Sequence, residues 1–220
     1  MATVYASNSG TTTRYIVSDW STTRNNSTGT AASDDPAGGR NTSGISVLHT
    51  PGRGAQVYGI TRSHFYFDTS GITGTVSSAT LKIFGYSQTS ADVIAIKSTA
   101  FGGDGGTALA TGDYGAIDFS TAYSAELATW SALGYNDITL NATALGDMKN
   151  NNAFIVALVE HDHDYADSAV SNATFQSGLY YDNWTGTSAD PYIDYTLAPE
   201  LPGHIRLSGY TKLGPGKVSL

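Results

Sequence analysis

The chain has 220 residues, no cysteine, 14% charged residues and a formal net charge of −8 at pH 7. This length suffices for one all-β domain with a sizeable core, and the lack of cysteine excludes a disulfide framework and thiolate chemistry. An acidic chain repels phosphate backbones and anionic lipids, so we expect no nucleic-acid partner and no membrane association. Gly, Ser, Thr and Tyr are plentiful whereas Met is scarce, which is typical of strands and turns rather than of helices.

Short β-branched and aromatic runs recur along the chain, separated by turns rich in Gly, Asn and Asp. The expected strands are 13–20, 63–68, 76–87, 92–99, 135–140, 153–160, 175–181 and 191–197. Many short strands with such turns predict an all-β fold, an antiparallel β-sandwich of the jelly-roll type with one or two short helices.

Alternation within the runs predicts which side chains face the core, because neighbouring residues of a strand point to opposite faces. In the run 76–87 the residues Ala79, Leu81 and Ile83 share one face. In the run 63–68 the inward residues are Phe65 and Phe67, and the outward residues are His64, Tyr66 and Asp68.

Two short helices are expected. In 123–130 the residues Tyr123, Leu127 and Trp130 are spaced i, i+4, i+7 and would share one face. The second helix is 142–149, preceded by Asn141 as an N-cap.

Residues 21–44 contain almost no apolar side chains. We interpret them as a long polar loop, and such loops are usually functional or disordered. The sequence shows no domain boundary before residue 198, so we expect one sandwich domain at 1–198.

The segment 199–220 carries Arg206, Lys212 and Lys217 against Glu200 alone, in contrast to the acidic remainder of the chain. We interpret it as an extended docking arm; a frayed terminus is the alternative. The apolar residues expected to make its contacts are Ile205, Leu207, Leu213 and Val218.

The stretch 63–87 is similar to the central motif of a known domain family. Phe67-Asp68, a Ser/Gly turn and then Val76-Ser77-Ser78-Ala79-Thr80-Leu81 resemble the pattern of DNRLRE-type domains of bacterial and phage surface proteins. The stretches 135–160 and 189–197 resemble the later part of that pattern. The resemblance covers roughly residues 13–197 and implies a jelly-roll sandwich like that of carbohydrate-binding modules, more firmly than it implies a function.

The composition also resembles that of structural proteins of tailed, particularly marine, bacteriophages. We therefore expect a non-enzymatic virion protein, a capsid decoration or cement protein that binds the major capsid protein or the tail and forms homo-oligomers. The N-terminus shows no signal peptide, so the expected location is the virion, assembled in the host cytoplasm and extracellular after lysis. The alternative is a carbohydrate-binding or adhesion module of a tail or secreted surface protein.

A cluster of aromatic residues near the C-terminus is the candidate binding site. Tyr180, Tyr181 and Trp184 would contact a surface glycan or a protein partner, although tyrosines in β-proteins often serve as core edges and cross-strand pairs. No nucleophile elbow, phosphate-binding loop or dinucleotide fingerprint is present. We expect no catalytic residue and no cofactor.

The sequence VEHDHDYAD, residues 159–167, invites interpretation as a metal site. If the preceding strand continued, His161 and His163 would share one face, and Asp162 and Asp164 the other. A His-x-His pair on one strand can bind zinc, but the sequence names no further ligand. We therefore interpret this stretch as the polar end of a core strand and assign no metal ligand.

Two aspartate groups are weaker candidates for calcium. Asp34 and Asp35 with Asp19 form one group, and Asp104 with Asp113 forms the other. Calcium takes six to eight oxygen ligands, and neither group has a known loop spacing. Solvated turns are the simpler interpretation.

Deletion of residues 199–220 tests the docking arm. We expect the truncated protein to stay folded and soluble, because the sandwich core lies before residue 198, and to fail to join the phage particle. Circular dichroism and immunoblotting of purified particles measure the two properties. Normal incorporation of the truncated protein would refute the arm.

Overall fold

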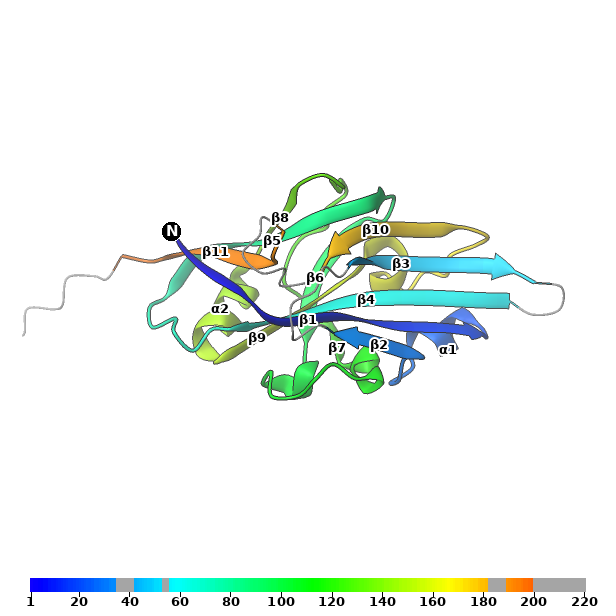
Figure 1. The fold of residues 1–220 in the computed structure, drawn as a ribbon, viewed down its shortest axis with the longest axis horizontal. Coiled ribbons are helices and arrows are strands. Elements are labelled where there is room, and N and C mark those ends of the chain that lie inside the picture. Colours follow the sequence, from blue (N-terminus) through cyan, green and yellow to red (C-terminus); the bar gives the residue numbers. More distant parts are fainter. Residues whose placement is uncertain (35–41, 53–55, 182–188, 200–220) are drawn as a thin grey trace, which may run out of the picture.

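The computed structural model describes residues 1–34, 42–52, 56–181 and 189–199. Within these ranges the chain forms the expected antiparallel β-sandwich with short helices (Figure 1). The strands are β1 (Ala2–Val17), β2 (Ala31–Asp34), β3 (Thr42–Pro51), β4 (Gln56–Asp68), β5 (Val76–Thr89), β6 (Val93–Ser98), β7 (Ile117–Ala122), β8 (Tyr135–Thr139), β9 (Ala153–Glu160), β10 (Thr174–Tyr180) and β11 (Tyr192–Leu197). The helical segments are α1 (Trp20–Arg24), η1 (Phe101–Gly103), η2 (Thr111–Gly115), α2 (Ala142–Asn150) and η3 (His161–Tyr165).

The strands form two sheets that share β1 and β5. In the first sheet, β11 pairs with the start of β1 and with β5, and β8 pairs with the other edge of β5. In the second sheet, β4 lies between β1 on one edge and both β3 and β9 on the other. The sheet extends through β10 beside β3, through β6 and β7 beside β9, and through β2 beside β1. A register shift between Ala6 and Asn8 lets β1 pass from the first sheet to the second.

The main core lies between the two sheets and confirms the predicted inward faces. Phe65 and Phe67 of β4 are fully buried, and Ala79, Leu81 and Ile83 of β5 are buried opposite them. Each of these residues is two positions from the next, as the period of a strand requires.

A second apolar layer covers the outer face of the second sheet. Segment 99–116 and α1 lie over this face, and three small clusters fill the space beneath them. In β9, Phe154, Val156 and Leu158 point into the main core, whereas Ile155, Ala157 and Val159 contact the second layer. The apolar residues of β9 are therefore continuous rather than alternating, because both faces of the strand are buried.

The second layer overturns the predicted exposure of His64. His64 does lie on the face opposite Phe65, but it is fully buried, with Nε2 3.0 Å from Thr12 Oγ1 and Nδ1 3.4 Å from Ser98 Oγ. Burial, and then the nearby positive charge of Arg62, lower the pKa of His64 to about 3. Alternation identified its face, but the covering segment comes from a distant part of the chain.

The helix expected at 142–149 is present, and the one expected at 123–130 is not. The Asn141 side chain accepts hydrogen bonds from the backbone of Thr143 and Ala144 at the start of α2, as an N-cap does. Residues 123–130 are extended, because Ser124 and Leu127 form isolated bridges to Leu140 and Val93. Long-range backbone pairing has overridden the local helical spacing there.

The polar stretch 21–44 is not one long loop. It contains most of α1 and all of β2, and β3 begins at Thr42. The strands β2, β3 and β7 were missed because small and hydroxyl-bearing residues interrupt their apolar pattern. The arm at 199–220 lies, from residue 200 on, outside the described residues.

The buried His64 predicts a pH dependence of stability. A folded-state pKa near 3 lies below the value of about 6.5 expected in the unfolded chain. Between these values the unfolded state binds more protons, so the free energy of unfolding falls as pH drops from about 6.5, by at most about 1.4 kcal/mol per pH unit for this residue. Urea unfolding of wild type and His64→Gln between pH 7 and 4 measures the difference.

The free energy of unfolding should fall less steeply with decreasing pH in His64→Gln than in the wild type. The carboxylates titrate in both proteins, so their contribution cancels when the two are compared. In the wild type, NMR signals of the His64 ring should stay constant from pH 8 to 5. A His64 ring that titrates in the folded protein within that range would contradict the assignment.

Candidate functional site

The first sheet carries a row of aromatic rings on its outer face. Val4, Leu81 and Ile193 point into the main core, so the residues next to them point outward. Strand register places Tyr5 of β1 opposite Tyr192 of β11. We call the resulting row the aromatic face; its members are Tyr5, Phe84, Tyr86, Tyr135, Tyr180 and Tyr192.

The rings of the aromatic face contact one another in an unbroken series. Centroids of Tyr5 and Tyr192 lie 5.6 Å apart, and those of Tyr192 and Tyr135 lie 5.1 Å apart. The series continues from Tyr135 to Phe84 at 5.1 Å, from Phe84 to Tyr180 at 5.8 Å and from Tyr180 to Tyr86 at 5.2 Å. Distances of 4.5–7 Å are typical of interacting aromatic pairs. The row therefore spans β1, β11, β8, β5 and β10.

The two ends of the row are the most exposed, with Tyr5 58% and Tyr86 43% accessible. The middle is packed more tightly: the Tyr135 hydroxyl donates to the Asp190 carbonyl at 3.2 Å. Burial, followed by neighbouring tyrosine and aspartate groups, raises the pKa of Tyr135, so its hydroxyl stays neutral. A connected surface row of tyrosines is a preferred setting for protein–protein contact.

The rings do not form a flat platform. Neighbouring planes are inclined by 48° between Tyr5 and Tyr192, 73° between Tyr192 and Tyr135, and 80° between Tyr135 and Phe84. Edge-to-face packing makes the surface ridged. A ridged surface suits interdigitating protein side chains better than the flat face of a polysaccharide.

A polar groove of about 560 Å³ lies at one end of the second sheet. Its walls come from the end of β4, the end of β6, the loop after η1 and the connection between α2 and β9. The residues used below are Tyr66, Asp68, Lys97, Asp104 and Asn151.

Hydrogen bonds hold the walls of the groove. Lys97 Nζ donates to Asp147 Oδ2 at 2.8 Å, and the Tyr123 hydroxyl donates to the same oxygen at 2.5 Å. The backbone of Gly105 has a φ of 80°, and a Cβ there would lie 2.3 Å from the ring of Tyr66, so only glycine allows this close packing. Burial, and then Asp68 and Asp104, raise the pKa of Tyr66. Aromatic rings among amides and carboxylates form a lining that suits a sugar.

The structure describes two of the three predicted aromatic site residues and places them on opposite sides of the sheet. Tyr180 belongs to the aromatic face. Tyr181 is buried in the main core with its hydroxyl 3.1 Å from Ser33 Oγ. Trp184 and the arm residues Ile205, Leu207, Leu213 and Val218 lie outside the described residues.

The stretch 159–167 does not continue as a strand. β9 ends at Glu160, whose carboxylate accepts hydrogen bonds from the backbone N–H groups of Asp162, His163 and Asp164. This cap starts the η3 turn, so the predicted shared faces are wrong. His163 Nδ1 contacts Glu160 at 3.0 Å, whereas His161 contacts Asp162 and Glu126.

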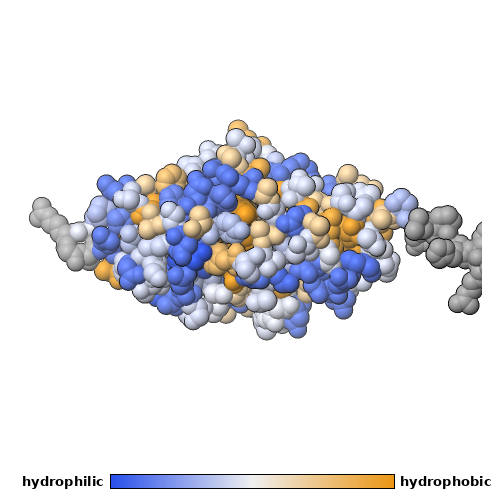
Figure 2. Space-filling model, turned by 180° about the vertical axis from the view of Figure 1, so that it is seen from behind, coloured by the Kyte–Doolittle hydropathy of each residue, from blue (hydrophilic) through white to orange (hydrophobic). Residues whose placement is uncertain are grey.

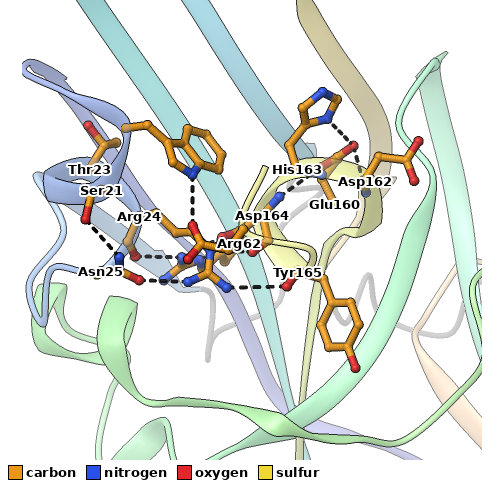
Figure 3. Close-up of polar contacts among 12 residues, drawn as sticks. Ser21, Thr23, Arg24, Asn25, Arg62, Glu160, Asp162, His163, Asp164 and Tyr165 are labelled. Atoms are coloured by element: carbon orange, nitrogen blue, oxygen red, sulfur yellow. Dashed lines mark hydrogen bonds and ion pairs between the residues drawn. The ribbon is translucent and has the colours of Figure 1, made fainter. Parts of the chain in front are cut away.

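Asp164 turns into the protein and pairs with Arg62 of β4 (Figure 3). Arg62 Nε and Nη2 donate to the two carboxylate oxygens at 2.8 and 2.7 Å, and Arg62 is 1% exposed and Asp164 0%. Arg62 Nη1 donates to the Tyr114 carbonyl, and Nη2 also donates to the Arg24 carbonyl. Burial alone lowers the pKa of Arg62, but the charge of Asp164 outweighs it, so the pKa is raised. The pair is a closed structural site with no surface for a ligand.

Arg24 of α1 joins the same cluster. Its Nε donates to the Asp164 carbonyl at 2.6 Å, and its guanidinium lies 4.2 Å from the centre of the Phe119 ring. The Trp20 indole donates to Asp167 at 3.0 Å. Side chains of α1, β4 and η3 therefore converge at one buried point (Figure 3).

The described calcium candidates accept hydrogen bonds from backbone N–H groups. Asp19 caps α1, Asp34 accepts from Leu109 N, Asp104 from Gly106 N and Asp113 from Ala110 N. Asp35 lies outside the described residues. Asp19, Asp104 and Asp113 thus fix local turns, whereas Asp34 joins β2 to the distant backbone of Leu109.

The side of the protein opposite to that seen in Figure 1 is mixed in hydropathy. From behind, hydrophobic residues form small patches separated by hydrophilic ones (Figure 2). Among the described residues, no helix has the length and apolar character needed to cross a membrane.

No protein-family model matches the chain, and no curated protein matches it significantly. The resemblance to DNRLRE-type domains therefore stays a prediction based on sequence pattern.

The buried pair predicts a large loss of stability when one partner is removed. Asp164→Asn leaves the Arg62 charge buried without a counter-charge, which typically costs about 3–5 kcal/mol. The control is Asp137→Asn, which breaks the pair of Lys82 with Asp137, a side chain 58% exposed; such a pair contributes at most about 1 kcal/mol. Urea denaturation at pH 7 measures the loss of unfolding free energy caused by each substitution. Equal effects of the two substitutions would contradict the structural role.

Proposed function

We propose that the protein is a non-enzymatic structural protein of a bacteriophage particle, which decorates the particle by docking through the aromatic face. The supporting observation is the connected row from Tyr5 to Tyr86 on the outer face of the first sheet. Tyrosine gives a large contact area at low conformational cost and keeps a polar group at the rim. The partner is a virion protein, the major capsid protein or the tail, or a second copy of the chain.

Two structural properties support a docking role over catalysis. The buried charged residues are engaged with one another, as Arg62 and Asp164 illustrate. The aromatic face is ridged and lies on strands held in register by backbone pairing. A rigid, preformed surface lowers the entropic cost of association. The sequence resemblance to phage and bacterial surface domains favours the particle as the setting.

A carbohydrate-binding or adhesion module is the second candidate. The observation in its favour is the polar groove, in which Tyr66 stands beside Asp68 and Asp104. Groups of this kind fix sugar hydroxyls while the ring packs on the apolar side of the sugar. The groove and the aromatic face are separate surfaces, so each candidate has its own variants.

The docking proposal predicts that Tyr5→Ser combined with Tyr86→Ser weakens binding to the particle. Truncating tyrosines that are binding hot spots costs about 2 kcal/mol or more, roughly a 30-fold loss of affinity. The measurement is co-sedimentation of the purified protein with phage particles assembled without it. The matched control is Tyr15→Ser, since Tyr15 lies on the same strand as Tyr5 and is 54% exposed but lies outside the aromatic face.

Mass spectrometry of purified particles is the first requirement, and absence of the protein from them would overturn the proposal. If Tyr15→Ser and the double variant lose particle binding equally, the aromatic face is not the docking surface. Binding on a glycan panel that Tyr66→Ala abolishes and the aromatic-face variant retains would favour the second candidate.

A further inference from the structure

The η3 turn meets a carboxylate from a distant segment of the chain. His161 Nδ1 lies 2.9 Å from Asp162 Oδ1 and 3.6 Å from Glu126 Oε2. One donor atom from each of the three residues lies within 4.8 Å of the other two. Glu126 belongs to the segment 123–130, which the sequence predicted to be a helix and which is instead extended.

Backbone pairing fixes the two segments on opposite sides of β6. Val93 pairs with Glu160 of β9 on one side and bridges to Leu127 on the other. Val93 and Leu127 exchange both backbone hydrogen bonds, at 2.7 and 3.1 Å. The His161 amide donates to the Asp92 carbonyl at 2.9 Å. Glu126 and His161 are each next to a paired residue, so their separation is set by the sheet.

Side-chain contacts fix the remaining orientation. The His161 ring stacks on Tyr165, with centroids 5.7 Å apart and planes inclined by 21°. The Glu160 carboxylate holds the backbone of Asp162, and the Asp162 side chain points away from the Arg62–Asp164 pair (Figure 3). Asp164 is anchored in the interior, so both ends of the turn are held. Ligands on a held backbone need little rearrangement to bind an ion.

We propose that Glu126, His161 and Asp162 form a binding site for one divalent ion of the zinc class. Zinc binds histidine nitrogen and carboxylate oxygen at about 2.0–2.2 Å, which places tetrahedral ligands roughly 3.4 Å apart. The observed separations of 2.9 and 3.6 Å bracket this value. A neutral imidazole with two carboxylates balances the charge of the ion, and water completes its coordination. An imidazole ligand favours zinc over calcium and magnesium, which prefer oxygen.

The ion would link the segment 123–130 to the η3 turn across the end of β6. Its effect is structural, because it joins two elements that contact the strand separately. The site differs from the His-x-His arrangement that the sequence suggested. His163 instead contacts Glu160 and stacks on Phe175, with ring centroids 4.8 Å apart.

The test uses the full chain without an affinity tag, treated with EDTA and then dialysed. Titration with zinc chloride, followed by isothermal calorimetry, should give one ion per chain. Thermal unfolding should shift upward by several degrees in excess zinc, because the ion binds only the folded state. His161→Gln and Glu126→Gln should each lose about tenfold or more in zinc affinity, because each removes one of three protein ligands, and loss of a group that merely supports a ligand already costs that much.

The matched control is His163→Gln, which removes a histidine two positions away and should keep wild-type zinc affinity. Circular dichroism confirms that each variant is folded, and Glu126→Gln keeps the size of the side chain if His161→Gln does not fold. The proposal is overturned if zinc does not bind stoichiometrically, or if the affinities of the His161 and Glu126 variants equal that of the wild type. The proposal is also overturned if His163→Gln loses zinc affinity while Glu126→Gln keeps it.

Discussion

The buried pair of Arg62 and Asp164 is the constraint on which the outer half of the second sheet depends. Arg62 rises from the centre of β4, and its donors reach Asp164 in η3, the Tyr114 carbonyl in η2 and the Arg24 carbonyl in α1. An arginine without these acceptors would be an unpaired buried charge, which is strongly destabilising. The elements η3, η2 and α1 must therefore all be in place for Arg62 to be paired. The small apolar clusters pack between these elements and the sheet.

This covering determines which surface is available for binding. With segment 99–116 and α1 over its outer face, the second sheet is buried on both sides along β9 and β6. The first sheet has one face in the main core, and its outer face carries the aromatic row that begins at Tyr5. The same sandwich thus has one side stabilised by a buried charge pair and another presenting tyrosines. The docking proposed for the aromatic face would use the outer side of the first sheet, which these covering elements do not reach.

Local pattern predicted a large part of this fold and a small part of its sites. Strand alternation placed Phe65 and Leu81 in the core, and Asn141 marked the start of α2, because these features depend on neighbours in sequence. The burial of His64 and the extended backbone of 123–130 depend on partners far away in the chain. The aromatic face depends on strand order: each tyrosine is visible in the sequence, but only the pairing of β1 with β11 and β5 with β8 brings them together.

The acidic residues of the stretch 160–164 have different structural roles, which depend on their partners elsewhere in the chain. Glu160 caps the η3 turn, and Asp164 neutralises the charge of Arg62 in the interior. Asp162 remains at the surface beside His161, where the extended segment 123–130 brings Glu126. Had that segment been the helix its spacing suggested, its backbone would not pair with Val93 and Glu126 would not be held opposite the turn. The proposed ion site therefore follows from the same long-range pairing that overrode the local helical signal.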